Sequence, residues 1–405
     1  MIINVSWKNV WRSKQRSVII MTAITLGIFA GLFLIAFSKG MTEQRISSSL
    51  KTEVSHIQIH NEGYLENNDF NLYIENIDSL SKLLETDHRV QGFSKRIVIN
   101  SLASTAETGA GVKITGVNPE IETFVTDLNT KVIEGQYFNG VKRKPIVIGQ
   151  KLAKKLKAKV RSKIVLQLQD TAGQTFPAAF RVVGIYKTTN TAFDEMNVFV
   201  RNTDIYNLCG LNASNAHEIS IFLNDRDEVN NLDMELERKF PDLEINTWEE
   251  GNIMLGYLND AMDQYMIIFI LIILFALYFG IANTMLMAIL ERRKEIGMLM
   301  AIGMKKFKVF RMIMYETIFL SLVGAILGII LGILSVYYFG KKGLDLSIWG
   351  TGLEAYGYDP IIYLSLDTGY IIQVVLWVVF TGVLASLLPA WKALRLNPCE
   401  ALRTD

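Results

Sequence analysis

The sequence predicts an α-helical membrane protein with four transmembrane helices and one large α/β domain outside the membrane. Its 405 residues are 50% hydrophobic and 20% charged, with a mean hydropathy of +0.25. This composition is too apolar for an ordinary soluble protein and too charged for a chain that lies wholly in a bilayer. Four long apolar runs, an uneven distribution of basic residues and one long stretch of globular patterning support this fold class.

Four apolar runs are long enough to cross a membrane as helices. An α-helix rises about 1.5 Å per residue, so roughly 20 residues span a hydrocarbon core of about 30 Å. We expect transmembrane helices over residues 17–38, 265–290, 312–339 and 369–391. The only charged residue within the four runs is Glu316, in the third.

The basic residues predict the orientation of these helices, because short loops rich in Lys and Arg are retained in the cytoplasm. Residues 1–16, 291–311 and 392–405 together hold 14 basic and 4 acidic residues, whereas the segment 39–264 holds 25 basic and 31 acidic residues. We therefore expect both termini and the 291–311 loop in the cytoplasm. The 39–264 segment and the 340–368 loop should lie on the other side.

The first 16 residues favour a helix that lies in the cytoplasmic interface. Ile3, Trp7, Val10 and Trp11 recur at helical spacing, with basic side chains on the opposite side, and indole rings favour headgroup depth. A plain extension of the first span with an aromatic belt is the alternative. A cleaved signal peptide is disfavoured, because the apolar run is longer than a signal h-region and does not end in a small-x-small site.

Residues 39–264 carry the patterning of a folded domain, with alternating apolar runs separated by amphipathic stretches. Each end of the segment has a strand-helix-strand pattern, which predicts an α/β subdomain made from the two ends. The middle is richer in strands and predicts a β-rich insert. The expected strands are 56–60, 95–102, 112–117, 145–148, 163–168, 180–186, 196–200, 218–223 and 243–248, and the expected helices are 74–84, 151–157 and 228–240.

The sequence contains no signature of an enzyme or of a metal site. Its four histidines form no HExxH motif, and neither a G-x-S-x-G motif nor a Walker A motif occurs. We therefore expect no catalytic residue, metal or cofactor in this chain, and any nucleotide site should lie on another polypeptide. Cys209 and Cys399 fall on opposite sides of the membrane in this topology, so no disulfide is expected.

Residues 142–163 contain ten Lys or Arg and no acid. A charge run of this kind is most often a solvated face, which suits the expected helix 151–157. Contact with an acidic partner or with anionic headgroups is the functional alternative.

The cytoplasmic loop after the second span contains an unusual apolar stretch. Residues 295–304 have the pattern of a short apolar helix in a loop otherwise rich in charge. An exposed apolar helix normally packs against a protein partner or the membrane surface. An interfacial helix without a partner is the alternative.

Two features mark the third span. Acids inside a membrane cost a few kcal/mol and generally face the bundle interior, so we expect Glu316 to pair with Arg311 or Arg292 near the interface. A proton-relay role is the alternative. Small residues repeat every four positions and form a stripe for close helix packing, within one subunit or between two. The stripe consists of Gly324, Gly328 and Gly332.

Several segments together carry a family resemblance. They are ERRKEIGMLMAIGM after the second span, the stripe GAILGIILG, the closing LASLLPAWKALRLNPCEALR and the opening WKNVWRSKQR. In these segments the chain resembles the FtsX/MacB-type permeases of ABC transporters. Within that group, VKITGVNPEIETFV and PIVIGQKLAKKL in the 39–264 segment look most similar to the LolC/LolE permeases, which release lipoproteins from the bacterial inner membrane.

The resemblance implies an inner-membrane transporter in which two permeases, identical or paralogous, join a dimer of a separate ATPase that binds ATP and Mg²⁺. ATP binding would shift the spans and move the outer domains, a mechanism called mechanotransmission, without a channel for the cargo. The loop after the second span would be a coupling helix seated on the ATPase. Its expected residues are Glu291, Arg292, Arg293, Glu295, Ile296, Gly297, Met298, Leu299, Ala301 and Gly303.

The family's Porter and Sabre subdomains would correspond to residues 50–105 with 215–250 and to residues 106–214. In the lipoprotein branch, acyl chains of the cargo would enter between the first span of one subunit and the second span of the other. The residues expected to line that lipid pocket are Phe29, Phe33, Phe37, Tyr265, Ile268 and Phe269.

One departure concerns the hook with which LolC catches the periplasmic chaperone LolA. The corresponding turn at 170–180 is short here, which leaves a LolE-like subunit or a different exporter open. The alternatives are MacB-like efflux of peptides or drugs with a periplasmic adaptor, and FtsX-like regulation of a cell-wall hydrolase. The size of the 39–264 segment favours a transporter, and no nucleic-acid partner is expected.

Overall fold

The computed structural model describes residues 2–12, 14–75, 77–139 and 143–394. The chain forms two compact units, which we call the membrane unit and the extramembrane domain. The membrane unit comprises Met1–Thr42, Asp260–Asp345 and Ile361–Asp405, and the extramembrane domain comprises Glu43–Asn259 and Leu346–Pro360.

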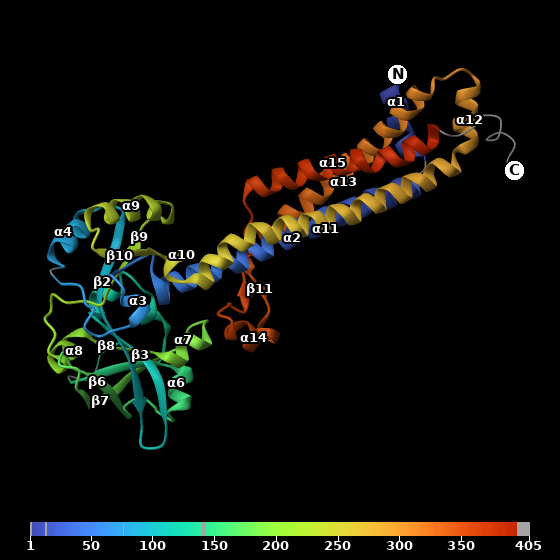
Figure 1. Cartoon of the computed structure of the whole chain (residues 1–405). Coiled ribbons are helices and arrows are strands. Elements are labelled where there is room, and N and C mark those ends of the chain that lie inside the picture. Colours follow the sequence, from blue (N-terminus) through green and yellow to red (C-terminus); the bar gives the residue numbers. More distant parts are fainter. Residues whose placement is uncertain (1, 13, 76, 140–142, 395–405) are drawn as a thin grey trace. The chain divides into compact units, whose positions relative to one another are not determined.

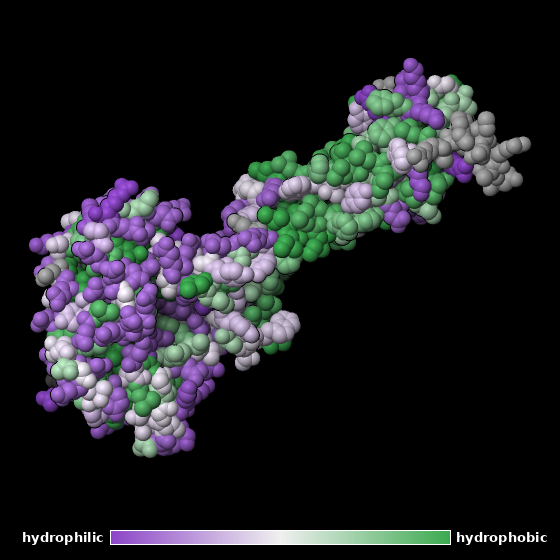
Figure 2. All heavy atoms as spheres, in the orientation of Figure 1, coloured by the Kyte–Doolittle hydropathy of each residue, from purple (hydrophilic) through white to green (hydrophobic). Residues whose placement is uncertain are grey.

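Four long helices build the membrane unit (Figure 1), and each has a stretch apolar enough to cross a bilayer, with a mean hydropathy between 2.4 and 2.7. Hydrophobic residues accordingly cover most of the visible surface of this unit (Figure 2). The helices are α2 (Lys14–Ser49), α11 (Ile253–Glu291), α13 (Lys306–Lys342) and α15 (Thr368–Leu394). Each covers its expected span, and α2 and α11 extend well beyond it because no proline interrupts the flanking residues.

The N-terminal helix α1 (Ile2–Arg12) packs on α13. The Ser6 Oγ donates a hydrogen bond to the Met312 carbonyl oxygen at 3.1 Å. The Trp7 ring lies edge-on against the Phe319 ring, with 5.4 Å between their centroids. These contacts hold α1 along the first turns of the third span.

The glycine stripe of α13 packs against α2 of the same chain. A Cβ atom at Gly324 would lie 2.9 Å from the Ile24 Cβ, and one at Gly328 would lie 2.8 Å from the Ile28 Cβ. Gly332 repeats this close approach one turn further along α2. Only glycine allows two helices to come this close, so the stripe serves packing within one subunit.

The other two long helices flank this central pair. A Cβ atom at Gly382 of α15 would lie 2.7 Å from the Ser321 Oγ of α13. One at Gly27 of α2 would lie 2.6 Å from the Leu277 side chain of α11. Thus α1 and α15 pack on α13, and α11 packs on α2.

The extramembrane domain is built on a sheet of ten strands in the order β10-β1-β9-β2-β3-β8-β5-β7-β4, with β6 pairing with β2 and β7. Strand β2 serves both parts of the sheet, because residues 90–96 pair with β9 and residues 97–104 pair with β3. The strands are β1 (Ile57–Asn61), β2 (Val90–Ser104), β3 (Gly109–Val117), β4 (Val132–Gly135), β5 (Pro145–Gly149), β6 (Lys163–Gln169), β7 (Thr175–Tyr186), β8 (Asn197–Arg201), β9 (Glu218–Leu223) and β10 (Leu243–Thr247).

Two main hydrophobic cores lie on the two parts of the sheet. One packs α4 and α9 on β1, β9 and β10, and the other packs α6 and α8 on strands from β3 to β8. Between them, the buried Arg96 guanidinium lies 2.5 Å from a Glu122 oxygen and 2.8 Å from a Glu218 oxygen. The helices of this domain are α3 (Tyr64–Asn67), α4 (Asp78–Thr86), α5 (Pro119–Glu122), α6 (Gln150–Lys155), α7 (Thr191–Met196), α8 (Asn202–Cys209), α9 (Val229–Lys239), α10 (Trp248–Gly251) and α14 (Gly350–Ala355).

One helix expected in this domain begins later than predicted. The helix expected over 74–84 begins only at Asp78, because Ile74 forms a β-bridge with Ala216. Strand β2 runs through both parts of the sheet, and its residues Ile97, Ile99 and Ala103 pack in the second core.

The 340–368 loop is also more than a connection. Its two ends pair as β11 (Leu344–Asp345) and β12 (Ile361–Ile362) in the membrane unit. Its middle, residues 346–360, packs as part of the extramembrane domain. Sequence patterning missed this because the loop residues have no regular apolar spacing.

The close contact between α2 and α13 can be tested with Gly328→Ala. An alanine favours the helical backbone by about 1 kcal/mol over glycine, but its Cβ would overlap Ile28 and the Thr25 carbonyl oxygen. Overpacking of this kind costs roughly 1–3 kcal/mol, so we expect a net loss of thermal stability in detergent.

Gly280→Ala on α11 is the matched control, because its Cβ would meet nothing within 4 Å. We expect that variant to be as stable as the wild type or slightly more stable. Equal shifts in the two unfolding midpoints would contradict the tight packing of α2 on α13.

Candidate functional site

The helix after the second span exposes an apolar tip. This helix, α12 (Arg293–Ala301), buries Ile296 and Gly297, whereas Met298 is 52% exposed and Ile302 is 79% exposed. Residues 302–304, expected to be helical, form a turn because Gly303 has a φ of +98°, which favours glycine. The exposed side of α12 therefore offers apolar surface to a partner, and Leu299 and Met300 are partly buried beside it.

An ion pair holds α12 against α1. The Arg12 guanidinium lies 2.8 Å from the Glu295 carboxylate, and both side chains are largely exposed. Exposed pairs contribute only about 0–1 kcal/mol, so this contact orients α12 more than it stabilises the fold.

A buried ion pair fixes the base of α12. The Arg292 Nη1 lies 3.0 and 3.3 Å from the two Glu316 oxygens, and its Nη2 donates to the Asn9 carbonyl oxygen at 3.3 Å. The two side chains are only 16% and 6% exposed. Of the two partners considered for Glu316, Arg292 is the one in contact, and Arg311 lies on the Tyr315 ring instead. The end of α11, α1 and α13 therefore meet at one charged contact.

A cavity of about 440 Å³ lies between α1, α11, α12 and α13, and both ion pairs line it. Its remaining walls are mainly apolar, from Val5, Met285, Ile289 and Met312. Of the other expected coupling residues, Glu291, Ala301 and Gly303 are exposed and Arg293 is partly buried.

The residues expected to line an acyl pocket lie on two separate helices. Phe29 and Phe33 of α2 lie 6.1 Å apart, and Phe33 also contacts the Phe339 ring of α13 at 6.0 Å. Phe37 is partly buried on the same helix. The α11 residues Tyr265, Ile268 and Phe269 are exposed. The α11 set thus remains available for contact with another molecule.

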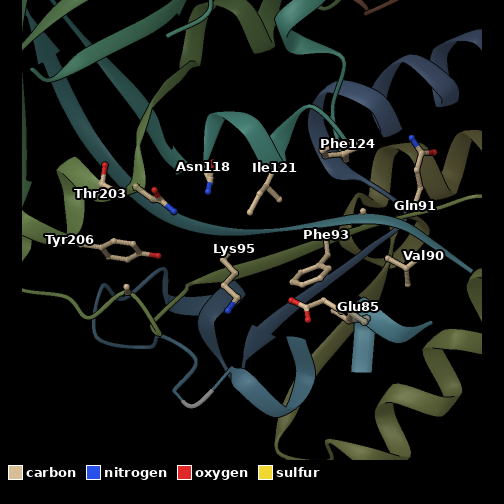
Figure 3. A pocket seen from close by; sticks show the side chains of 14 residues that line it. Glu85, Val90, Gln91, Phe93, Lys95, Asn118, Ile121, Phe124, Thr203 and Tyr206 are labelled. Carbon is tan, nitrogen blue, oxygen red and sulfur yellow. The ribbon is translucent and has the colours of Figure 1, made fainter. Parts of the chain in front are cut away.

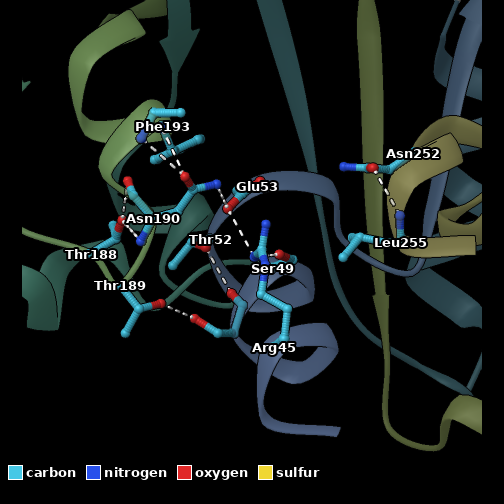
Figure 4. A network of polar contacts seen from close by, with 12 residues as sticks. Arg45, Ser49, Thr52, Glu53, Thr188, Thr189, Asn190, Phe193, Asn252 and Leu255 are labelled. Atoms are coloured by element: carbon cyan, nitrogen blue, oxygen red, sulfur yellow. Dashed lines mark hydrogen bonds and ion pairs between the residues drawn. The ribbon is translucent and has the colours of Figure 1, made fainter. Parts of the chain in front are cut away.

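The extramembrane domain holds a polar network that sequence reasoning missed (Figure 4). The Asn190 Nδ2 donates to the Glu53 carboxylate at 2.8 Å, and Arg45 contacts both Glu53 and Ser49. The Asn190 side chain also caps α7 by accepting from the Phe193 N–H. Glu53 lies in the single π-helical turn that continues α2, so the network ties the end of α2 to α7.

The 346–360 loop joins the same region. The Lys187 Nζ lies 2.8 Å from a Glu354 oxygen of α14. The Arg45 guanidinium packs on Gly357, where a Cβ atom would lie 2.6 Å from its Cζ. Gly357 has a φ of +80°, so glycine is required there both for the backbone and for the contact.

Asp194 of α7 is buried beside this network. Its carboxylate accepts hydrogen bonds from the Thr188 N–H at 3.0–3.1 Å and from the Thr188 Oγ1 at 2.8 Å. Burial nevertheless raises the pKa of Asp194 to about 7, because desolvation of the carboxylate outweighs these hydrogen bonds. Asp194 therefore titrates near neutral pH.

A groove of about 620 Å³ runs beside β2 on the same domain (Figure 3). Ile121 of α5 and Phe124, just after it, form one wall, and Phe93 and Tyr206 contribute aromatic surface. Lys95 and Glu85 lie at its polar side. The groove is wide enough for several apolar side chains.

The basic stretch of residues 143–163, with Lys142 outside the described residues, forms an exposed and partly paired face. Lys155 lies 2.5 Å from Glu195, and Lys157 lies 2.7 Å from Glu107. The turn at 170–174 between β6 and β7 is tight, because Asp170 accepts from the Gln174 N–H at 2.8 Å. No extended hook projects from this hairpin.

Comparison with known families identifies the chain. Residues 17–239 match the MacB-like periplasmic core domain, and residues 267–398 match the C-terminal part of FtsX-like permeases. The chain belongs to the FtsX/MacB family of ABC transporter permeases. As a permease with four apolar helices, it is a membrane protein.

Relatives of this permease fall into more than one group. The lipoprotein-releasing system transmembrane protein LolC of Haemophilus influenzae is 26% identical over 348 residues, which cover 81% of each chain. An uncharacterised ABC transporter permease of Methanocaldococcus jannaschii is 22% identical and covers 100% of this chain and 98% of the relative. The pyoverdine export ATP-binding/permease protein PvdT of Pseudomonas entomophila is 21% identical over 100% of this chain but only 59% of its own length.

The titration of Asp194 gives a pH prediction. Its pKa is raised in the folded permease, so the folded state binds the proton more tightly than the unfolded state does. The resulting contribution to the free energy of unfolding is present at low pH and is lost as pH rises from about 4 through about 7. We expect the Asp194→Asn variant to lose this dependence, which amounts to roughly 2 kcal/mol between pH 5 and 7.5.

The measured quantity is the difference in unfolding free energy between wild type and variant in detergent at each pH. Taking the difference removes the opposing contribution of His56, whose pKa burial lowers to about 4. A difference that stays constant between pH 5 and 7.5 would rule out Asp194 as the titrating group.

Proposed function

We propose that this permease is the membrane subunit of an ATP-driven transporter in the bacterial inner membrane that extracts lipoproteins, or another amphiphile, from the outer leaflet. A separate ATPase dimer would bind ATP and Mg²⁺, and a second permease would complete the complex. We choose lipoproteins as the cargo class because the match to LolC covers 81% of both chains. The exposed apolar tip of α12 supports docking of an ATPase.

The contacts of α12 suggest how such docking would move the rest of the permease. A displacement of α12 would be transmitted to α1 through the Arg12–Glu295 ion pair and to α13 through the Arg292–Glu316 ion pair. Because α13 is packed tightly on α2, the two helices would move as one body. Helix α2 continues to Ser49, where Arg45 and Glu53 contact α7 and the 346–360 loop.

The cargo would engage two kinds of surface. An acyl chain is expected beside Phe29 and Phe33 of one subunit and the exposed α11 residues of the other. The apolar groove beside β2 could hold part of the protein moiety, because apolar recesses on extramembrane domains are typical contact sites.

The second candidate is export of a small amphiphile, supported by the match of PvdT and of the macrolide export protein MacB of Campylobacter jejuni, which is 32% identical over 31% of this chain. Such a role would require a periplasmic adaptor. Regulation of a cell-wall hydrolase is a third, less favoured reading, because this extramembrane domain is large. Purification from native membrane with the associated proteins would separate the three.

Docking of the ATPase predicts that Met298→Asp abolishes its co-purification and ATP-driven activity. A carboxylate on the exposed apolar tip would have to be desolvated in the interface, at a cost of several kcal/mol. Membrane insertion should be unchanged, since Met298 is exposed. ATP hydrolysis by the purified complex is the measurement.

Met254→Asp is the matched control, because Met254 is also exposed, at 64%, but lies in the extramembrane domain. We expect it to retain the ATPase. Normal coupling in the Met298→Asp complex would exclude α12 as the docking helix.

The proposed cargo predicts photocrosslinking from the two span surfaces. A photoreactive residue at Phe33 or Phe269 should capture lipoprotein in intact membranes, and one at the exposed Phe380 of α15 should not. Mass spectrometry of the crosslinked species checks this. An active permease that captures no lipoprotein at either site would point to another cargo.

A further inference from the structure

We propose that the membrane unit binds the phosphate of an anionic phospholipid in a pocket between α1, the turn after α12 and the start of α13. The pocket has a volume of about 580 Å³. Lys308, Arg311 and Tyr315 of α13 form its polar side, and Ile3, Leu299 and Ile302 form its apolar side. The proposal depends only on the membrane location of the chain. The pocket shares Leu299 and Ile302 with the loop proposed to dock the ATPase, whereas Met298 does not line it.

No acidic side chain in the described part of the chain neutralises the positive charge of this pocket. Among the described residues, no ion pair involves Lys308 or Arg311, and no acidic side chain lines the pocket. The Arg311 Nη2 donates to the Tyr315 hydroxyl at 3.1 Å, which uses one of the five guanidinium donors. A guanidinium held in this way suits a phosphate, which accepts two parallel hydrogen bonds.

Two other cations at the same end of the unit form ion pairs within the chain. Arg12 and Arg292 each contact a carboxylate, Glu295 and Glu316 respectively, around the neighbouring 440 Å³ cavity. Lys308 and Arg311 are two of several cations at this end without an ion pair among the described residues, and they are the two that line this pocket. An anion from outside the chain is the natural counterion for them.

The position of the pocket favours a lipid over an acidic protein. After Arg311 the only charged residue of α13 before Lys341 is the buried Glu316, so the two cations lie where the apolar run begins, at headgroup depth. Trp7, packed on Phe319 at the start of this span, is also typical of that depth. The apolar walls would contact the acyl chains near the glycerol. An acidic protein surface would make no such apolar contact. Basic pockets beside transmembrane helices commonly bind anionic headgroups.

The test is native mass spectrometry of the full-length permease in detergent, titrated with dioleoyl-phosphatidylglycerol or dioleoyl-phosphatidylcholine. We expect wild type to retain phosphatidylglycerol in preference to phosphatidylcholine. The double variant Lys308→Gln/Arg311→Gln should bind phosphatidylglycerol roughly 30-fold more weakly, because each cation near an anionic headgroup contributes about fivefold.

Two further variants separate a specific site from general attraction. Lys341→Gln/Lys342→Gln removes the same charge from the other end of α13, where the two lysines lie beside Tyr337 and Tyr338, and it should retain the lipid. The charge-preserving Lys308→Arg variant, which keeps the Arg311 guanidinium, should also retain it. A loss in that variant would overturn a site based on charge.

Three other results would overturn the proposal. In the first, the wild type shows no preference for phosphatidylglycerol over phosphatidylcholine. In the second, the two Gln double variants lose the same amount of phosphatidylglycerol binding. In the third, Lys308→Gln/Arg311→Gln binds the lipid like the wild type but no longer co-purifies with the ATPase. The last result would assign the pocket to a protein partner. The Met298→Asp test of ATPase docking is independent of all three.

Discussion

The membrane unit depends on the contact between Arg292 and Glu316. A lone carboxylate on the third span would cost a few kcal/mol, and removal of one partner from a buried pair typically costs roughly 3–5 kcal/mol. Neither residue is therefore tolerated without the other in this position. Since Arg292 also donates to the Asn9 carbonyl oxygen, the same guanidinium fixes α1, the end of α11 and α13 around the base of α12.

The packing of α13 on α2 is close along the glycine stripe. The approach of α13 to α2 leaves no space for a Cβ at Gly324 or Gly328, and close-packed surfaces slide or rotate as bodies rather than deform. The α2–α13 pair is therefore a close-packed part of the membrane unit. Within the extramembrane domain, the Glu53–Asn190 contact joins the turn that follows α2 to α7.

Sequence reasoning predicted the features that depend on local pattern. Hydropathy located the four spans, and the spacing of Gly324, Gly328 and Gly332 predicted a packing stripe. It could not choose between Arg292 and Arg311 as the partner of Glu316. Arg311 is near in the chain, whereas the contact with Arg292, 24 residues away, depends on how the end of α11 packs beside α13. It missed the network of Arg45, Glu53, Asn190 and Glu354, since these residues come from distant segments and carry no shared periodicity. The Asn190 cap, with an acid four residues later, was the one local sign.

The cytoplasmic charge bias that predicted the orientation combines two physically different groups of cations. Arg12 and Arg292 contact carboxylates of the same chain and so build the base of α12. Lys308 and Arg311 have no such partner among the described residues and line an apolar-walled pocket. A count of Lys and Arg weighs both groups equally, although only the second adds to the field outside the protein. The count that predicts the orientation therefore does not by itself locate the cations that line a pocket, and Lys308 and Arg311 are found only from the fold.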